Sequence, residues 1–253
     1  MPVAGADQTG ILRDMTTHAS RTLMVPDLTT LLGAVPRGTS ADYKHAILED
    51  NVLGRKSASA RSKTLKHLRN LYALDENDPV FAALRSLAEA DPESIPMLAL
   101  LSGATCDALL RSTAEWVLNI PPGTPVSSED LRLVIEERFP DRYSERTLIE
   151  TGRRALSSWT QSGHLTGRMK KVRCRAAASV GSVIFALFLG HLSGVRGLPL
   201  YETFWANLLD ASAVEIDSLA FAASQRGMME YRRMGEVAEF GFSGVMAEGL
   251  VRG

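Results

Sequence analysis

The sequence predicts a mainly α-helical protein in which two helix–turn–helix units, the second with a small wing, pack with a helical core. Hydrophobic residues make up 45% of the 253 residues, which is enough apolar material for a substantial core. Aromatic residues make up only 6%, which fits a helical chain rich in Leu and Ala better than a β-sandwich. Apolar residues recur mostly at helical spacing, behind Ser and Thr residues that can cap a helix.

Turn signals and charge divide the chain into five predicted regions. A chain of this length can hold one large domain or two small ones. The clearest boundary is Pro121-Pro122-Gly123, which favours a linker. The regions are a flexible N-terminal segment at 1–26, a first helix–turn–helix unit at 27–76, a helical core at 77–122, a second helix–turn–helix unit with a basic arm at 123–175, and a C-terminal helical region with a hairpin and a tail at 176–253.

Individual helices are predicted from capping residues and apolar spacing. Thr39 or Ser40, Ser57, Ser127 and Ser144 each precede an apolar stripe, and each side chain can accept a hydrogen bond from a first-turn amide. Pro and Gly residues at the far ends stop several of these helices. The predicted spans are 27–34, 40–51, 57–72, 79–90, 95–118, 127–139, 144–161, 199–210 and 212–226.

Residues 176–192 form the most apolar run of the chain. Its 17 residues are at the lower limit for spanning a bilayer. The run contains Ser179, Ser182 and His191, and no belt of Trp or Tyr flanks it. We therefore expect a buried core helix and no membrane insertion.

Two other stretches depart from helical spacing. His164 to Arg175 is short and basic, and Gly167 within it suits a small wing hairpin or an extended arm. Glu230 to Phe242 alternates apolar and polar residues around Gly235, which predicts a small β-hairpin.

Positive charge is concentrated in two islands, although the formal net charge is only −1. Residues 55–69 hold six basic residues and no acid, and residues 142–175 hold nine basic residues and two acids. The rest of the chain then carries −14. Clustered cations bind phosphates, so this pattern is typical of a duplex-binding protein. Solvated helix faces are the alternative interpretation.

Each basic island coincides with the second helix of a helix–turn–helix pair. In such a pair the first helix braces the phosphate backbone and the second presents a polar face to the major groove. Two ordinary helical hairpins with soluble faces are the alternative. The predicted contacts, mostly to the DNA backbone, are Arg55, Lys56, Ser59, Arg61, Lys63, Lys66, Arg146, Arg153, Arg154, Ser157, Gln161, Lys170, Lys171 and Arg173.

Catalytic and metal-binding motifs are sparse. The five histidines show no ligand spacing, and Cys106 and Cys174 cannot supply a four-ligand zinc site alone. Gly54-Arg55-Lys56-Ser57 lacks the earlier glycine of a phosphate-binding loop. We expect no catalytic centre, no metal and no cofactor. The sequence has no signal peptide and few cysteines, which favours the cytoplasm.

Two further stretches carry a family resemblance. The first is Glu49-Asp50-Asn51-Val52-Leu53, followed by Arg55-Lys56-Ser57 and Arg61. The second is Tyr143-Ser144-Glu145-Arg146-Thr147, followed at helical distance by Ser162-Gly163-His164-Leu165. In order and spacing they resemble BrxA-like proteins, small core components of the BREX bacteriophage-exclusion systems. The similar regions span roughly residues 28–192.

The resemblance implies a mainly helical fold without a catalytic centre and duplex DNA binding through two helix–turn–helix units. It also implies work beside other phage-defence proteins such as a DNA methyltransferase.

Other functions stay open. A helical adaptor could bind protein partners in the same defence complex through the acidic body. RNA could replace DNA, although the lack of aromatic residues in the basic islands argues against stacking on single strands. Membrane attachment is a third alternative, and an unrecognised enzyme is the weakest.

Overall fold

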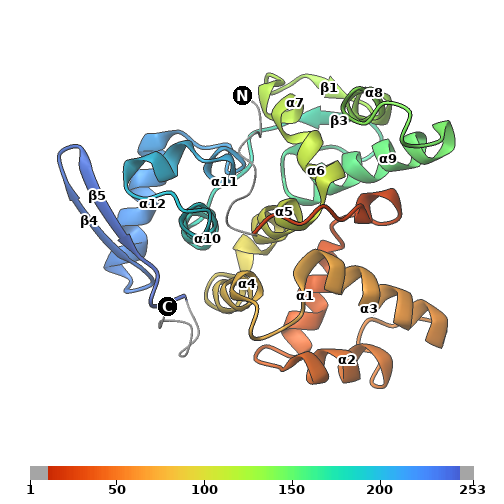
Figure 1. Cartoon of the computed structure of the whole chain (residues 1–253), viewed down its shortest axis with the longest axis horizontal. Helices are drawn as coiled ribbons and strands as arrows, with labels where there is room; N and C mark the ends of the chain where they lie inside the picture. Colours follow the sequence, from red (N-terminus) through yellow and green to blue (C-terminus); the bar gives the residue numbers. More distant parts are fainter. Residues whose placement is uncertain (1–10, 246–253) are drawn as a thin grey trace.

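A computed structural model describes residues 11–245 of the chain. The protein is mainly helical, with two small antiparallel sheets (Figure 1). The predicted fold class is confirmed at this level.

Three helices form the N-terminal part, at the lower right of Figure 1. They are α1 (Val25–Ala34), α2 (Ser40–Leu48) and α3 (Ala58–Tyr72). The caps are as predicted: the Thr39 side chain accepts from the Asp42 amide, and Ser57 accepts from the Ala60 amide. Helix α2 ends three residues before the predicted boundary, because the chain turns at Asn51, which has a positive φ of 53°.

The central region contains more helices than predicted. Its elements are α4 (Pro79–Ala90), the 3-10 helix η2 (Pro92–Ser94), α5 (Ile95–Cys106), α6 (Ala108–Ser112) and α7 (Ala114–Asn119). The single helix predicted at 95–118 is therefore wrong. The chain is extended at Asp107, whose side chain caps α6 at the Leu110 amide and also accepts a hydrogen bond from the His18 amide. A long-range contact thus ends α5.

The next region combines two helices with a small sheet. Its elements are β1 (Pro125–Val126), α8 (Ser128–Arg138), α9 (Glu145–Gln161), β2 (Leu165–Thr166) and β3 (Lys171–Arg173). Strand β3 lies in the middle and pairs antiparallel with both β1 and β2. The helices begin at the predicted caps Ser127 and Ser144. Of the two forms expected for 164–175, the hairpin is the one present.

The C-terminal region lies at the left of Figure 1. Its elements are α10 (Val180–Leu192), the 3-10 helix η3 (Leu198–Glu202), α11 (Phe204–Asn207), α12 (Ala213–Gln225), β4 (Glu230–Met234) and β5 (Val237–Gly241). The predicted hairpin is confirmed. The helix predicted at 199–210 is wrong, because extended Thr203 splits it and caps α11. The predicted tail lies mainly outside the described residues.

Two apolar helices form the centre of the core. Every residue of α5 except Pro96 is buried, and α5 contacts α1, α3, α4, α9 and α10. In α10, 11 of 13 residues are buried, which confirms the predicted core helix. Helices that are apolar all round need such an enclosed position. Within residues 11–245 no helix is both long enough and apolar enough to cross a membrane.

Residues 11–24 pack between the region of α3 and the region of α9. The 3-10 helix η1 (Thr17–Ala19) contacts both α3 and α9, and Figure 1 shows this segment in red between them. His18 and Leu23 have no exposed surface. We expected a flexible segment over 1–26; its described part is instead anchored, and residues 1–10 lie outside the description.

Candidate nucleic-acid interface

The outward face of α3 carries uncompensated positive charge. Leu65, Leu68 and Leu71 are buried, whereas Ser59, Lys63 and Lys66 are exposed, as the helical spacing predicts. Within the described part of the chain, no ion pair involves the predicted cations Lys56, Arg61, Lys63 or Lys66. This face therefore keeps its charge available for an external anion.

Arg55 has a different role from its neighbours in the first island. Its guanidinium pairs with the Asp27 carboxylate and donates to Thr64 Oγ1 at 3.2 Å. The Asn51 side chain accepts from the Arg55 amide at 2.7 Å and donates to the Arg55 carbonyl at 3.1 Å. Arg55 thus fixes the turn between α2 and α3, and only part of its side chain remains exposed.

A groove of about 670 Å³ lies at the start of α3. It is bounded by residues 21–27, by the first turns of α3 and by the end of α9. Arg55, Ser59 and Lys63 line it from the first predicted unit, and Gln161 lines it from the second. The structure therefore brings four of the predicted site residues, from segments 100 residues apart, to one surface.

Arg21 also lines this groove, although it is not among the residues predicted from the sequence. It is exposed and has no ion pair with any described residue. Burial lowers the pKa of His67 on α3, and the charges of Arg21 and Lys66 lower that pKa further. Positive potential thus extends from the groove along α3. A lone arginine in a stretch with weak structural signals offered no basis for predicting this position.

The exposed face of α9 is less basic than its sequence implies. Arg146 is exposed and unpaired among the described residues. Glu150 lies one helical turn away and pairs with Arg153 at 2.7 Å and with Arg154 at 3.4 Å. Arg154 also donates to the Ala19 carbonyl at 2.6 Å. Arg146 is the predicted α9 cation that remains uncompensated, and Arg154 chiefly anchors the N-terminal segment.

Ser157 and Gln161, the two uncharged α9 residues among the predicted DNA contacts, are engaged within the protein. The Gln161 carbonyl accepts a hydrogen bond from the Val25 amide at 2.9 Å. The Gln161 amide group donates to Ser157 Oγ at 3.2 Å. Both side chains are half-buried. They connect α9 to the beginning of α1 at the edge of the groove.

The wing between β2 and β3 presents cations at its tip. Gly167 has a φ of 98°, and a Cβ there would lie 2.1 Å from the Lys170 carbonyl oxygen, so the turn requires glycine. Arg168 and Lys170 are exposed, with no ion pair to any residue from 11 to 245. The Lys171 ammonium donates to the Gly167 carbonyl and closes the turn. Lys170 is thus free, whereas Lys171 is partly used inside the wing.

Arg173 is wrong as a predicted phosphate contact. Only 2% of its side chain is exposed, and its guanidinium forms two 2.9 Å hydrogen bonds to the Asp210 carboxylate. Its Nε donates to the Val117 carbonyl at 2.9 Å. Arg173 is the buried residue at the end of β3, and its side chain joins the wing sheet to the C-terminal region.

His164 forms part of the same buried junction. Its imidazole lies 3.0 Å from both Ser162 Oγ and the Leu208 carbonyl oxygen. Burial lowers the pKa of His164 to about 4, with Asp210 acting to raise it and Arg173 to lower it. The imidazole is therefore neutral at pH 7. A neutral ring can donate to Leu208 through one nitrogen and accept from Ser162 through the other.

A second buried cluster has the residue types of a hydrolytic triad. Ser158 Oγ lies 2.9 Å from His18 Nε2, and His18 Nδ1 lies 3.2 Å from Asp107 Oδ2. All three residues have no exposed surface, and Ser158 Oγ also accepts from the Leu23 amide. Burial acts to raise the pKa of Asp107, but the contacts with His18 lower it overall. The cluster fastens residues 11–24 to α6 and α9.

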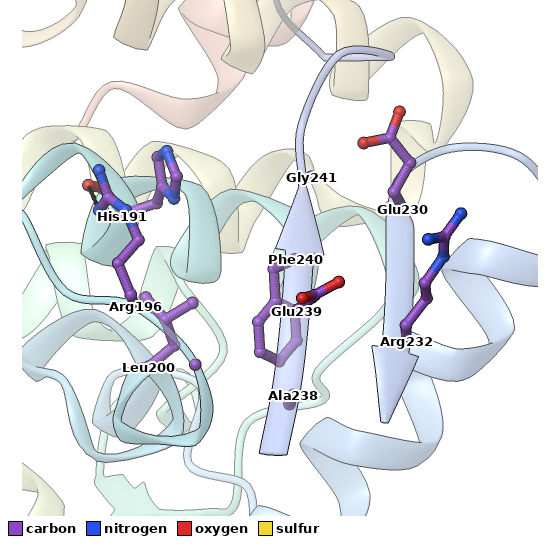
Figure 2. Close-up of a pocket in the computed structure, with 10 residues that line it drawn as sticks. His191, Arg196, Leu200, Glu230, Arg232, Ala238, Glu239, Phe240 and Gly241 are labelled. Carbon is purple, nitrogen blue, oxygen red and sulfur yellow. Dashed lines mark hydrogen bonds between the residues drawn. The ribbon is translucent and has the colours of Figure 1, made fainter. Parts of the chain in front are cut away.

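Another groove, of about 480 Å³, lies beside the C-terminal hairpin. Figure 2 shows His191 and Arg196 on one side of it and Phe240 of β5 on the other. Arg232 and Glu239 contribute opposite charges to its lining. The groove lies at the other end of the molecule from α3 (Figure 1). Its mixed charge does not favour a polyanion.

The sequence comparisons identify no relative of this chain. No protein-family model matches the sequence, and no curated protein matches it significantly. Within the described residues, no group of three or more His, Cys, Asp or Glu side chains is arranged to hold a metal ion.

Proposed function

We propose that this chain is a non-catalytic protein that binds duplex DNA through α3, the adjoining groove and the wing. The observation that carries the proposal is the unpaired positive charge on α3 and the turn before it. Lys56, Arg61, Lys63 and Lys66 have no ion pair within residues 11–245, and Arg21 adds a fifth cation at the groove. Clustered, uncompensated cations provide the counterion-release term that dominates DNA binding.

The order of elements around α9 supports the same proposal. Strand β1, helices α8 and α9, and the β2–β3 hairpin follow one another, and β3 returns to pair with β1. A helix pair followed by a hairpin that closes on an earlier strand is the arrangement of a winged helix–turn–helix unit. We infer that α9 serves as the recognition helix of such a unit. Arg146 and the wing cations then contact the backbone on either side.

We infer that the protein recognises DNA mainly through its backbone. Ser157 and Gln161 have their polar groups engaged internally, and Ser59 is the one predicted polar residue that lies exposed beside free cations. Backbone contacts carry little sequence information. Binding is therefore weakly sequence-specific.

We further propose that the protein acts in a BREX-like phage-defence system, beside partners such as a DNA methyltransferase. This part rests on the BrxA-like resemblance. The residues that carry the resemblance occupy positions with defined backbone roles: Asn51 holds the α2–α3 turn, Ser144 caps α9, and Gly163 follows α9 with a φ of 86°. Co-purification of a methyltransferase with the tagged chain from its native host tests the proposal.

The DNA-binding proposal is tested by fluorescence anisotropy with a mixed-sequence duplex. We expect wild-type affinity to fall at least about ten-fold between roughly 50 and 200 mM salt, because several phosphates are engaged. Lys63→Glu/Lys66→Glu removes two free cations and should abolish most binding at low salt. Arg226→Glu/Arg232→Glu is the matched control, since both arginines are exposed in the C-terminal region. Equal binding by the two double variants, or salt-insensitive binding, contradicts the proposal.

A helical adaptor is the second candidate, and one observation favours it. Of the seven exposed large hydrophobic side chains among the described residues, four lie on α12 and the hairpin: Val214, Phe221, Met234 and Val237. Such exposed apolar groups are typical of protein-binding surfaces. Under this alternative a stable complex with a defence partner survives Lys63→Glu/Lys66→Glu and is lost on Phe221→Ser/Val237→Ser.

A further inference from the structure

The wing tip carries an apolar side chain that folding does not explain. Met169 is 91% exposed, which is the highest value among the large hydrophobic residues described. It lies between the two free cations Arg168 and Lys170. Met234, on the C-terminal hairpin, is the nearest comparison at 84% exposed, but it is not flanked by cations on both sides: Arg233, which precedes it, pairs with Asp217, and Gly235 follows it.

The turn that presents Met169 is well defined. The ladder between β2 and β3 pairs Thr166 with Val172 directly below the tip. The Lys171 ammonium donates to the Gly167 carbonyl, and Gly167 has the positive φ that the turn needs. The backbone at Met169 is therefore held by a short, braced hairpin, so little backbone freedom is lost when the exposed side chain binds a partner.

The surroundings of Met169 favour a nucleic-acid groove over an apolar protein surface. An apolar docking surface is usually depleted of lysine at its centre, whereas here both neighbours of Met169 in the chain are cations. In a duplex, phosphates flank each groove and the base stack lies between them. Arg168 and Lys170 lie on the two sides of the flexible Met169 thioether. Their positive charges match the phosphates that flank a groove, and the apolar group between them matches the base stack.

We propose that Met169 is a wedge that enters the minor groove next to the groove contacted by α9, partly unstacks one base step and bends the duplex. This inference rests on the proposed DNA binding. The wing begins four residues after α9 ends, so a duplex held by α9 brings its neighbouring groove to the wing. Arg168 and Lys170 bind the phosphates on the two sides, and the Met169 side chain displaces groove water and contacts the bases. The protein then bends DNA as well as binding it.

The test measures affinity and DNA shape on the same duplex. The duplex contains several TA steps, which unstack readily, with 2-aminopurine beside them and a donor–acceptor pair at its ends. Wild-type protein should raise 2-aminopurine fluorescence and shorten the end-to-end distance. Met169→Ala should lose both signals while its affinity changes by less than about ten-fold, because the phosphate contacts remain. Met169→Leu should restore them.

Met234→Ala is the matched control, since it removes a similarly exposed methionine, 84% against 91%, at the distant hairpin. It should leave both signals unchanged. If wild-type protein binds the duplex without altering either signal, or if Met169→Ala retains both, the wedge is wrong and DNA binding stands. If wild-type protein does not bind, the proposed function itself fails, and the wedge fails with it.

Discussion

Gln161, at the end of α9, accepts a hydrogen bond from the amide of Val25, the first residue of α1, at 2.9 Å. This contact joins the second helix of the second predicted unit to the helix that begins the first predicted unit. The groove lined by Arg21, Lys63 and Gln161 lies at the same junction. The relative placement of the two basic surfaces therefore depends on contacts across this junction, and under the DNA-binding proposal a duplex that lies along the groove would meet both.

Replacement of Gln161 should weaken the junction. Gln161→Ala leaves the buried Val25 amide without its acceptor, and we expect a loss of about 1–3 kcal/mol in the free energy of unfolding. Gln161→Glu keeps an acceptor oxygen at the same place and should restore most of that loss. Chemical denaturation measures both variants. If Gln161→Glu is as unstable as Gln161→Ala, the hydrogen bond to Val25 does not stabilise the fold.

Substitution of Arg173 should lower the stability of the fold, whereas substitution of Lys170 in the same wing should lower DNA affinity. Arg173→Ala leaves the Asp210 carboxylate partly buried without its partner, and we expect a loss of about 3–5 kcal/mol in stability. Lys170→Ala removes an exposed cation, so stability should change by less than about 0.5 kcal/mol while DNA affinity falls.

Thermal denaturation and anisotropy on both wing variants check this prediction. Arg173→Ala may be measured at low temperature if it is unstable at 25 °C, and Arg173→Lys supplies a milder variant that keeps the charge. A stable Arg173→Ala protein that has lost only DNA binding would return Arg173 to the phosphate-contacting set.

His164 should make the fold sensitive to mild acid. Burial lowers its pKa to about 4 in the folded protein, compared with about 6.5 in an unfolded chain. Because the unfolded state binds the proton more tightly, stability falls as the pH drops from about 6.5 to 4, by roughly 3 kcal/mol. Urea denaturation at several pH values measures the slope. His164→Gln cannot titrate, so its stability should depend less on pH over this interval; an unchanged slope would assign the effect to other groups.

Local signals account for the parts of the fold that the sequence predicted well. Ser57, Ser127 and Ser144 cap their helices through amides three residues ahead, so both the residue and its partner lie within one turn. The outward position of Lys63 and Lys66 follows from helical spacing against Leu65 and Leu68. These features need no knowledge of tertiary structure.

The errors involve partners that are distant in sequence. Asp107 ends α5 because it binds His18, which is 89 residues away. Arg173 is buried because Asp210, 37 residues later, neutralises it, and a strand of three residues gives no alternation from which to infer its inward face. The count of basic residues along the sequence therefore overestimated how much unpaired positive charge the second basic island presents. In the first island Arg55 pairs with Asp27, but Lys56, Arg61, Lys63 and Lys66 form no ion pair with any described residue, so the prediction there is stronger.

His67 should report DNA binding directly. Its pKa is lowered by burial and by the nearby charges of Arg21 and Lys66. Phosphates bound to those cations would offset their repulsion, so the pKa of His67 should rise in the complex. By linkage, affinity should then increase as the pH falls through the range in which His67 titrates. NMR titration of the imidazole with and without duplex measures the shift.

His191 provides an internal control for that experiment, because burial and Arg196 also lower its pKa but it lies beside the C-terminal hairpin. Its pKa should be the same in the free and bound protein. Equal upward shifts of His67 and His191 would indicate a general polyelectrolyte effect. No shift of His67 in a saturated complex would mean that the duplex does not engage Arg21 and Lys66, and the interface would then have to lie on the wing and Arg146 alone.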